Sequence, residues 1–219
     1  MHTDPGVVKH ISTTQMIEAI EWNASKTQPE NIQYISLHLL SNIAAVGDLI
    51  LKEALAKNKN LLTAIFSKSL NQSTKPKIIE ECVYVISNII NDSNAVVVME
   101  FVRNEYFVSF FEMAKMWRYE AEPVKILFAA MNLMLDYGDY LKADYQNRNP
   151  VFLEIRDRIE LDSFLGYFKK VEQLSDVRYQ IREFETRFAR LGEEDEDSEE
   201  RRGFGGFGVF RNQGQTYFS

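Results

Sequence analysis

Cysteine, histidine and proline are scarce in this chain, and each shortage narrows the classes of protein to which it can belong. The 219 residues contain one cysteine, three histidines and five prolines. A single cysteine, Cys82, excludes an internal disulfide and a cysteine-rich metal site. The histidines (His2, His10 and His38) lack the H-E-x-x-H spacing of zinc enzymes. The sequence also lacks a nucleophile elbow and a phosphate-binding glycine-rich loop. We therefore expect no catalytic residue, no cofactor and no bound metal.

Long apolar runs and an excess of positive charge are also missing. No apolar run approaches the roughly 20 residues that span a bilayer, and the first ten residues lack the pattern of a signal peptide. The net charge of −7 argues against general affinity for nucleic acid or an anionic membrane. The composition fits a protein of the cytoplasm and nucleus. An acidic protein of this kind favours basic protein partners.

Three asparagines recur at nearly constant intervals, each inside an apolar segment. Asn42, Asn88 and Asn132 are separated by 46 and 44 residues. The surrounding strings are LHLLSNIAAVGD, YVISNIIND and FAAMNLMLDYGD. Self-similarity at about 40–47 residues is typical of HEAT and armadillo arrays. One amide per repeat on one helical face makes a ladder that can grip the backbone of an extended peptide. The function is therefore expected in a surface and not in a catalytic pocket.

The apolar periodicity predicts a recurring order of short, middle and long helix. Residues 1–12 are expected to be irregular, and a first, partial repeat begins at residue 13, with Asn31 capping its long helix. The complete units are predicted at 49–57, 60–70 and 77–90, then 94–103, 106–117 and 123–135, then 151–158, 161–173 and 176–190. An irregular insertion is expected at 139–150. The fold class is thus all-α, an armadillo-repeat superhelical solenoid over residues 13–191 whose last repeat is a polar cap.

The C-terminal segment differs in composition from the repeats. Gly192 is expected to end the last helix. Seven acids then fall within residues 193–200, and a glycine- and phenylalanine-rich stretch follows. Self-repulsion of such an acidic block favours disorder. We predict a disordered tail over residues 192–219.

Residues 31–189 resemble the C-terminal half of the importin-α family, the armadillo adaptors that bind nuclear localisation signals. The strings that carry the resemblance are HLLSNIAAVGD, IEECVYVISNIIND, the NLMLDYGD stretch that begins at Asn132, and NPVFLEIRDRIELDSF. An acidic run before a Gly/Phe-rich tail also occurs at that family's C-terminus. The resemblance implies a nuclear-import adaptor that holds basic localisation-signal peptides on its concave face.

The resemblance also implies which residues bind the peptide. Asn42, Asn88 and Asn132 would clamp the peptide backbone. The side chains four residues earlier, His38, Tyr84 and Phe128, would flank the stems of Lys or Arg, because one helical turn separates each pair. The family carries tryptophan at those flanking positions, whereas this chain carries none there. The basic arm that recruits importin-β is also missing, since residues 1–22 contain one lysine and no arginine.

Three further interpretations follow from the same residues. The missing tryptophans favour an armadillo scaffold that binds a protein partner while its peptide groove is degenerate. The absence of an N-terminal cap before the first helix is consistent with a fragment of a longer adaptor. The family's last repeat binds a recycling exportin, so the resemblance assigns that contact to the segment Leu161 to Arg190.

Overall fold

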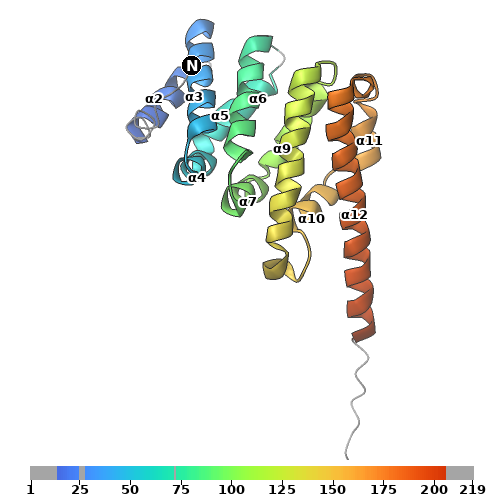
Figure 1. Ribbon diagram of the computed structural model, residues 1–219. Helices are drawn as coiled ribbons and strands as arrows, with labels where there is room; N and C mark the ends of the chain where they lie inside the picture. The colour runs from blue at the N-terminus through green and yellow to red at the C-terminus, as the bar shows by residue number, and fades with distance from the viewer. Residues whose placement is uncertain (1–13, 25–27, 72, 206–219) are drawn as a thin grey trace, which may run out of the picture.

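The computed structural model describes residues 14–24, 28–71 and 73–205, and every regular element within these ranges is a helix (Figure 1). The prediction of an all-α fold is confirmed. Within the same ranges, no helix combines the length and the apolar composition that crossing a bilayer requires.

The helices follow the short, middle and long order predicted from the sequence. A first pair consists of α2 (Thr14–Ala24) and α3 (Glu30–Val46). The units that follow are α4 (Leu49–Lys57), α5 (Lys59–Ser69) and α6 (Pro76–Ile90), then α7 (Ala95–Arg103), α8 (Tyr106–Met116) and α9 (Ala121–Tyr140). The last group comprises the 3-10 helix η1 (Lys142–Tyr145), α10 (Pro150–Arg156), α11 (Leu161–Gly166), the 3-10 helix η2 (Val171–Gln173) and α12 (Ser175–Gly205).

The long helices α3, α6, α9 and α12 lie side by side in chain order (Figure 1). Each contacts the next one along the chain, α3 with α6, α6 with α9 and α9 with α12. We call these four helices the long-helix row. The row brings together side chains that are about 45 residues apart in the sequence, which is the condition for a shared binding surface.

Polar caps recur at the starts of successive short helices. The carboxylate of Asp48 accepts a hydrogen bond from the backbone N–H of Leu51 at 3.0 Å, and Asn94 accepts one from Val97 at 3.1 Å. Such caps satisfy N–H groups that have no partner inside the helix. Asp48 and Asn94 stand 46 residues apart, the same interval as that between the first two repeated asparagines. The short helices α4 and α7 therefore begin in the same way, whereas Asn149, the cap of α10, follows Asn94 after 55 residues.

The hydrophobic core of the last two units is rich in phenylalanine. The Phe128 ring on α9 lies 5.8, 5.0 and 5.6 Å from three other rings, measured between centroids; these belong to Phe164, Phe168 and Phe184. All four side chains are buried. Edge and tilted contacts at these distances are the favoured geometries for aromatic pairs. The cluster therefore joins α9 to α11 and α12 through packed rings.

Several helix boundaries differ from the sequence-based prediction, and the helix predicted at 161–173 is divided into α11 and η2. Helix α3 begins at Glu30 and has Pro29 at its N-cap position, so Asn31 does not cap it. Helix α9 spans Ala121–Tyr140, whereas the prediction began at Pro123 and ended at residue 135. A proline in the first helical turn removes an N–H that would have no partner, so α9 can begin before it. The predicted irregular insertion accordingly starts later and contains η1.

Helix α12 also continues well past Gly192, where the prediction ended it. The helix runs to Gly205, so the start of the predicted disordered tail is helical instead. Two acids of this stretch are held by basic side chains from other elements, which favours continuation of the helix. Asp195 is buried between Arg148 and Arg156, and Lys142 donates to Glu194 at 2.5 Å. The remaining predicted tail, residues 206–219, and the predicted irregular N-terminus, residues 1–12, lie outside the described residues.

We expect Asp195→Asn to destabilise the C-terminal half of α12. The bidentate hydrogen bond from Arg148 lowers the pKa of the Asp195 carboxyl from its ordinary 3.8. Burial opposes this shift, and the charge of Arg156 adds to it. The ionised Asp195 carboxylate stabilises the fold fully at pH values above its ordinary pKa. This stabilisation is lost as the pH falls through the lowered pKa of the folded protein. Removing the charge should cost about 2 kcal/mol. Amide hydrogen exchange of residues 193–205 measures the loss.

The control is Asp197→Asn, which removes an exposed carboxylate of the same helix two residues later. Its exchange rates should stay close to those of the parent protein, because surface charges contribute little. Equal exchange in the two variants would show that the general acidity of the block, and not the Arg148–Asp195 pair, sets the stability of this half of α12.

Candidate peptide-binding face

Asn88 on α6 faces the neighbouring helix α3. Its Nδ2 atom donates to the backbone oxygen of Ser41 at 3.1 Å and to the Ser41 hydroxyl at 3.2 Å. These contacts fix the plane of the amide. Within the described residues the Oδ1 atom of Asn88 makes no hydrogen bond, and the side chain is partly exposed. An oriented amide with a carbonyl oxygen still available is suited to accept a backbone N–H from a peptide.

Asn42 is exposed on α3, at the position that corresponds to Asn88 on α6. Its Nδ2 atom donates to the backbone oxygen of His38, one turn earlier in the same helix, at 2.9 Å. The contact is local, so no neighbouring helix covers the side chain. Asn42 and Asn88 thus retain the accessibility that the predicted clamp requires.

Asn132 on α9, in contrast, is not accessible to a peptide. Only 4% of it is exposed, and its Nδ2 atom donates to the backbone oxygen of Gln180 at 3.1 Å and to the Gln180 side chain at 3.2 Å. Its Oδ1 atom is buried without a hydrogen-bond partner. The predicted clamp role is wrong for this residue, because α12 covers the amide. Asn132 is instead a polar link between two long helices.

Phe128 is also misassigned by the sequence-based prediction. Its side chain is fully buried in the phenylalanine cluster, so it cannot flank the stem of a peptide lysine. The physical cause is α12, which places Phe184 against the ring from more than 50 residues away. The aromatic side chain one turn before Asn132 therefore belongs to the core.

Tyr84 on α6 is partly exposed and stands among carboxylates. Burial first, and then the nearby carboxylates of Glu80, Glu122 and Glu81, raises the pKa of the Tyr84 hydroxyl. Glu122 comes from α9, so the carboxylates approach the ring from two long helices. Glu81 pairs with His38 and Glu122 with Lys125 at 3.6 Å, whereas Glu80 forms no ion pair within the described residues. The setting is an aromatic face with net negative surroundings.

His38 occupies the corresponding position on α3. Its Nδ1 atom lies 3.1 Å from a carboxylate oxygen of Glu81, and its ring stacks on Tyr34 with centroids 5.9 Å apart. The ring is exposed. His38 therefore joins α3 to α6 and extends the aromatic surface toward Tyr34.

The second half of the row is closed by ion pairs. Arg187 on α12 contacts Asp136 on α9, and it pairs with Glu183 of its own helix at 2.8 Å. Arg190 pairs with Asp139 at 3.0 Å. These contacts use the charged groups that face the gap between α9 and α12, so the open part of the row extends from α3 to α9.

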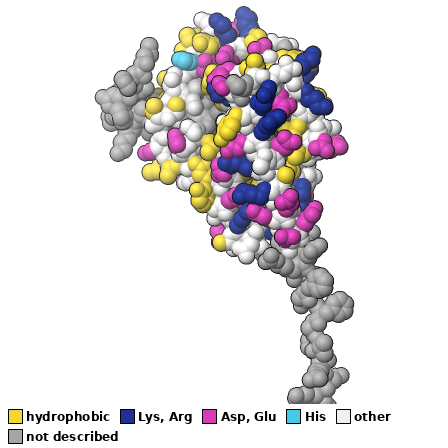
Figure 2. All heavy atoms as spheres, turned by 45° about the vertical axis from the view of Figure 1, so that its right-hand side comes forward, with side chains coloured by type: hydrophobic (Ala, Val, Ile, Leu, Met, Phe, Trp, Pro, Cys, Tyr) yellow, Lys and Arg dark blue, Asp and Glu magenta, His cyan; other side chains and the backbone are white. Residues whose placement is uncertain are grey.

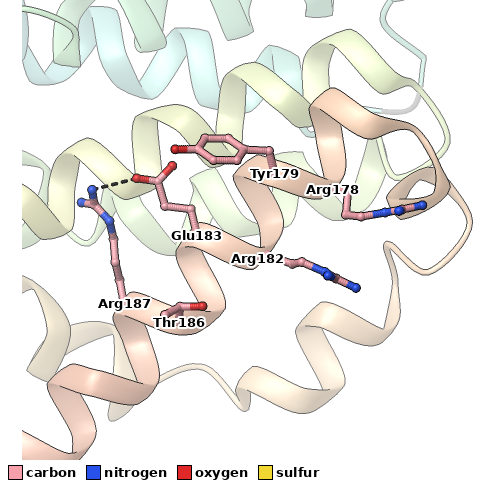
Figure 3. Close-up of a pocket in the computed structure, with 6 residues that line it drawn as sticks. All are labelled: Arg178, Tyr179, Arg182, Glu183, Thr186 and Arg187. Atoms are coloured by element: carbon pink, nitrogen blue, oxygen red, sulfur yellow. Dashed lines mark hydrogen bonds and ion pairs between the residues drawn. The ribbon is translucent and has the colours of Figure 1, made fainter.

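A cleft of about 670 Å³ lies over α12, and no motif in the sequence predicts it. Its lining is Arg178, Tyr179, Arg182, Glu183, Thr186 and Arg187, all on one helix (Figure 3). The arginines already have partners within the chain. Arg178 donates to the backbone oxygens of Glu172 and Gln173, and Arg187 contacts two carboxylates. The cleft is thus a surface hollow between paired charges.

Other chemistries find no support in the described part of the chain. Cys82 is fully buried, and burial raises the pKa of its thiol to about 12, so it is not a reactive nucleophile. Within the described ranges no three His, Cys, Asp or Glu side chains gather in a way that could hold a metal ion. The candidate site is therefore the face that carries Asn42, Asn88, Tyr84 and His38.

Comparison with models of protein families, with curated proteins and with solved structures found no match for this chain.

Proposed function

We propose that this chain is an armadillo-type binding module that holds a short basic peptide across α3, α6 and α9, in the manner of a nuclear-import adaptor. The peptide would be a nuclear localisation signal of a cargo protein that moves between cytoplasm and nucleus. The observation that carries the proposal is the setting of Tyr84, a partly exposed aromatic ring among three carboxylates and one turn from the oriented amide of Asn88.

The chemistry of this face suits lysine or arginine. An aliphatic stem packs on the Tyr84 ring, and a cation near an aromatic face gains about 0.5–1 kcal/mol at an exposed site. Glu80 forms no ion pair among the described residues and shares a hydrogen bond with the Tyr84 side chain, so its carboxylate lies beside the ring where a peptide cation can pair with it. The Asn88 carbonyl oxygen then accepts a backbone N–H. Main-chain contact and charge contact together favour an extended basic segment over a helical one.

The face limits the length of the bound segment. Neighbouring helices pack about 8–10 Å apart, so the path from α3 to α9 covers roughly 20 Å. An extended chain advances about 3.3 Å per residue, which corresponds to about six residues. The half of the row between α9 and α12 is closed by ion pairs, so it adds no peptide residues to this length. A single cluster of basic residues fits this face, whereas a signal with two separated clusters does not.

A titration with a labelled peptide that carries one basic cluster tests the proposal. We expect measurable binding that weakens as salt rises, because exposed charge pairs are screened. Asn88→Ala and Glu80→Gln should each weaken the affinity about tenfold, as expected for one lost hydrogen bond or charge contact. Asn60→Ala, which alters an exposed asparagine on α5, is the control and should bind like the parent.

A second function is favoured by a specific observation, the closure of the row at Asn132. Its buried amide and the Arg187–Asp136 contact hold helices together, as in a scaffold whose groove is degenerate. Such a scaffold would bind a folded protein partner on its outer surfaces. Absence of basic-peptide binding at every salt concentration, in protein with intact helical content, would support this function and reject the adaptor proposal.

A further inference from the structure

One side of α3 carries exposed apolar side chains in a line. Ile35, Leu39 and Val46 are 59%, 43% and 49% exposed. Separations of four and seven residues place them on one face of the helix. Ser41, whose hydroxyl accepts a hydrogen bond from Asn88 of α6, lies on another face of α3. We call these three side chains the α3 stripe.

The internal repeat indicates what kind of neighbour the α3 stripe accommodates. A shift of 46 residues places Glu81 and Val85 of α6 at the positions of Ile35 and Leu39. Both α6 side chains are buried, and α6 presents this side to α3. The same face is therefore covered by a long helix in one repeat and uncovered in the repeat before it. Its position suits a second helix of the same kind.

The other end of the row is chemically different. The outer residues of α12 include Arg178, Arg182 and Glu185, which are all exposed. Figure 2 shows basic and acidic side chains interspersed over the surface on this side of the molecule. Packing the apolar α3 stripe on such a surface would desolvate charges without pairing them. A head-to-tail contact between two copies is therefore unfavourable.

We propose that the α3 stripe packs against the same stripe of a second copy, forming a closed twofold dimer. The three side chains are uncharged, so the surface is complementary to itself and brings no like charges together. A twofold contact uses one patch on both partners and leaves no free end. Trp22 on the neighbouring helix α2 is a further exposed apolar side chain, at 66%. Asn42 lies three residues after Leu39 and four before Val46, on the same face of α3, so the dimer and a peptide contact at Asn42 exclude each other, whereas Asn88 and Tyr84 on α6 lie outside the stripe.

Measuring the mass in solution tests the dimer. The full chain should show a concentration-dependent mass that reaches twice 25.5 kDa in light scattering or sedimentation. Leu39→Glu should raise the dissociation constant about a hundredfold or more, because the charge is introduced twice across the twofold axis. Leu174→Glu, the same change at a leucine that is 52% exposed near α12, is the matched control and should leave the dimer intact.

Chemical crosslinking locates the contact independently of folding effects. The native Cys82 is fully buried, so thiols introduced by Leu39→Cys or Leu174→Cys are the accessible ones within the described residues. A short bis-maleimide should join two copies of the Leu39→Cys variant and not two copies of the Leu174→Cys variant. A monomeric mass at all concentrations would overturn the proposal. So would a dimer that persists unchanged in Leu39→Glu, or crosslinking through Leu174→Cys alone.

Discussion

Phe128→Ala should lower the free energy of unfolding by about 3–5 kcal/mol, the range for deleting a large buried aromatic side chain. The ring contacts three other phenylalanines with centroids within 6 Å, and α9, α11 and α12 all depend on that cluster. The free energy of unfolding of an ordinary domain is only about 5–15 kcal/mol, so this substitution removes a large part of it. Urea denaturation monitored by circular dichroism measures it.

Phe128→Leu is the control for the cavity in this experiment. Leucine keeps most of the volume, so the loss should fall to about 1–2 kcal/mol. Because Phe128 is buried, peptide affinity measured at low temperature, where both variants are folded, should equal that of the parent. A selective loss of affinity with little change in stability would restore Phe128 to the binding face and contradict its placement in the core.

Gly138→Ala should destabilise the protein by about 2–4 kcal/mol, because the new methyl group has no room. A Cβ atom at Gly138 would lie 2.0 Å from the Oδ1 atom of Asn149 and 2.6 Å from its Cγ atom. Asn149 is buried and makes four hydrogen bonds, two of which cap α10. Displacing it costs steric strain and leaves buried polar groups unpaired. A fall in melting temperature of roughly 5–15 °C is expected in calorimetry.

Glycine to alanine at Gly192 is the control, and it should change the stability in the opposite direction. Gly192 lies inside α12, and the nearest atom to its added Cβ, in Phe152, would be 3.9 Å away, an ordinary contact. Alanine favours the helix over glycine by up to about 1 kcal/mol. Gly192→Ala should therefore raise the melting temperature. Similar effects of the two substitutions would show that the tight contact with Asn149 is relieved at little cost.

The sequence predicted best what local signals determine. The bounds of α4 agree with the prediction, because Asp48 caps the helix and apolar residues recur at helical spacing. The helix starting at Pro76 was placed within one residue. Boundaries failed where distant residues decide them, and α12 is the clearest example. Its extension beyond Gly192 depends on Arg148 and neighbouring bases, which no pattern within the acidic block reveals.

The candidate site was predictable to the same extent. The spacing located Asn42, Asn88 and Tyr84 on partly or fully accessible helix faces. It treated Asn132 and Phe128 as equivalent to them, yet α12 covers both, and a repeat pattern does not reveal what the next repeat buries. The carboxylate of Glu122 beside Tyr84 also escaped notice, since it reaches the ring from another long helix.

The helical extension of α12 has a consequence for the electrostatics of the whole molecule. Seven acids on a free tail would sweep a volume around their attachment point, and their effective concentration at a basic-peptide site would be high. In the folded chain, Glu194 and Asp195 are held beside Lys142, Arg148 and Arg156. The α12 helix reaches Gly205 beyond the neighbouring end of α9 (Figure 1). Glu194 and Asp195 are thus held as fixed counter-charges to these bases and do not move as they would on a free tail.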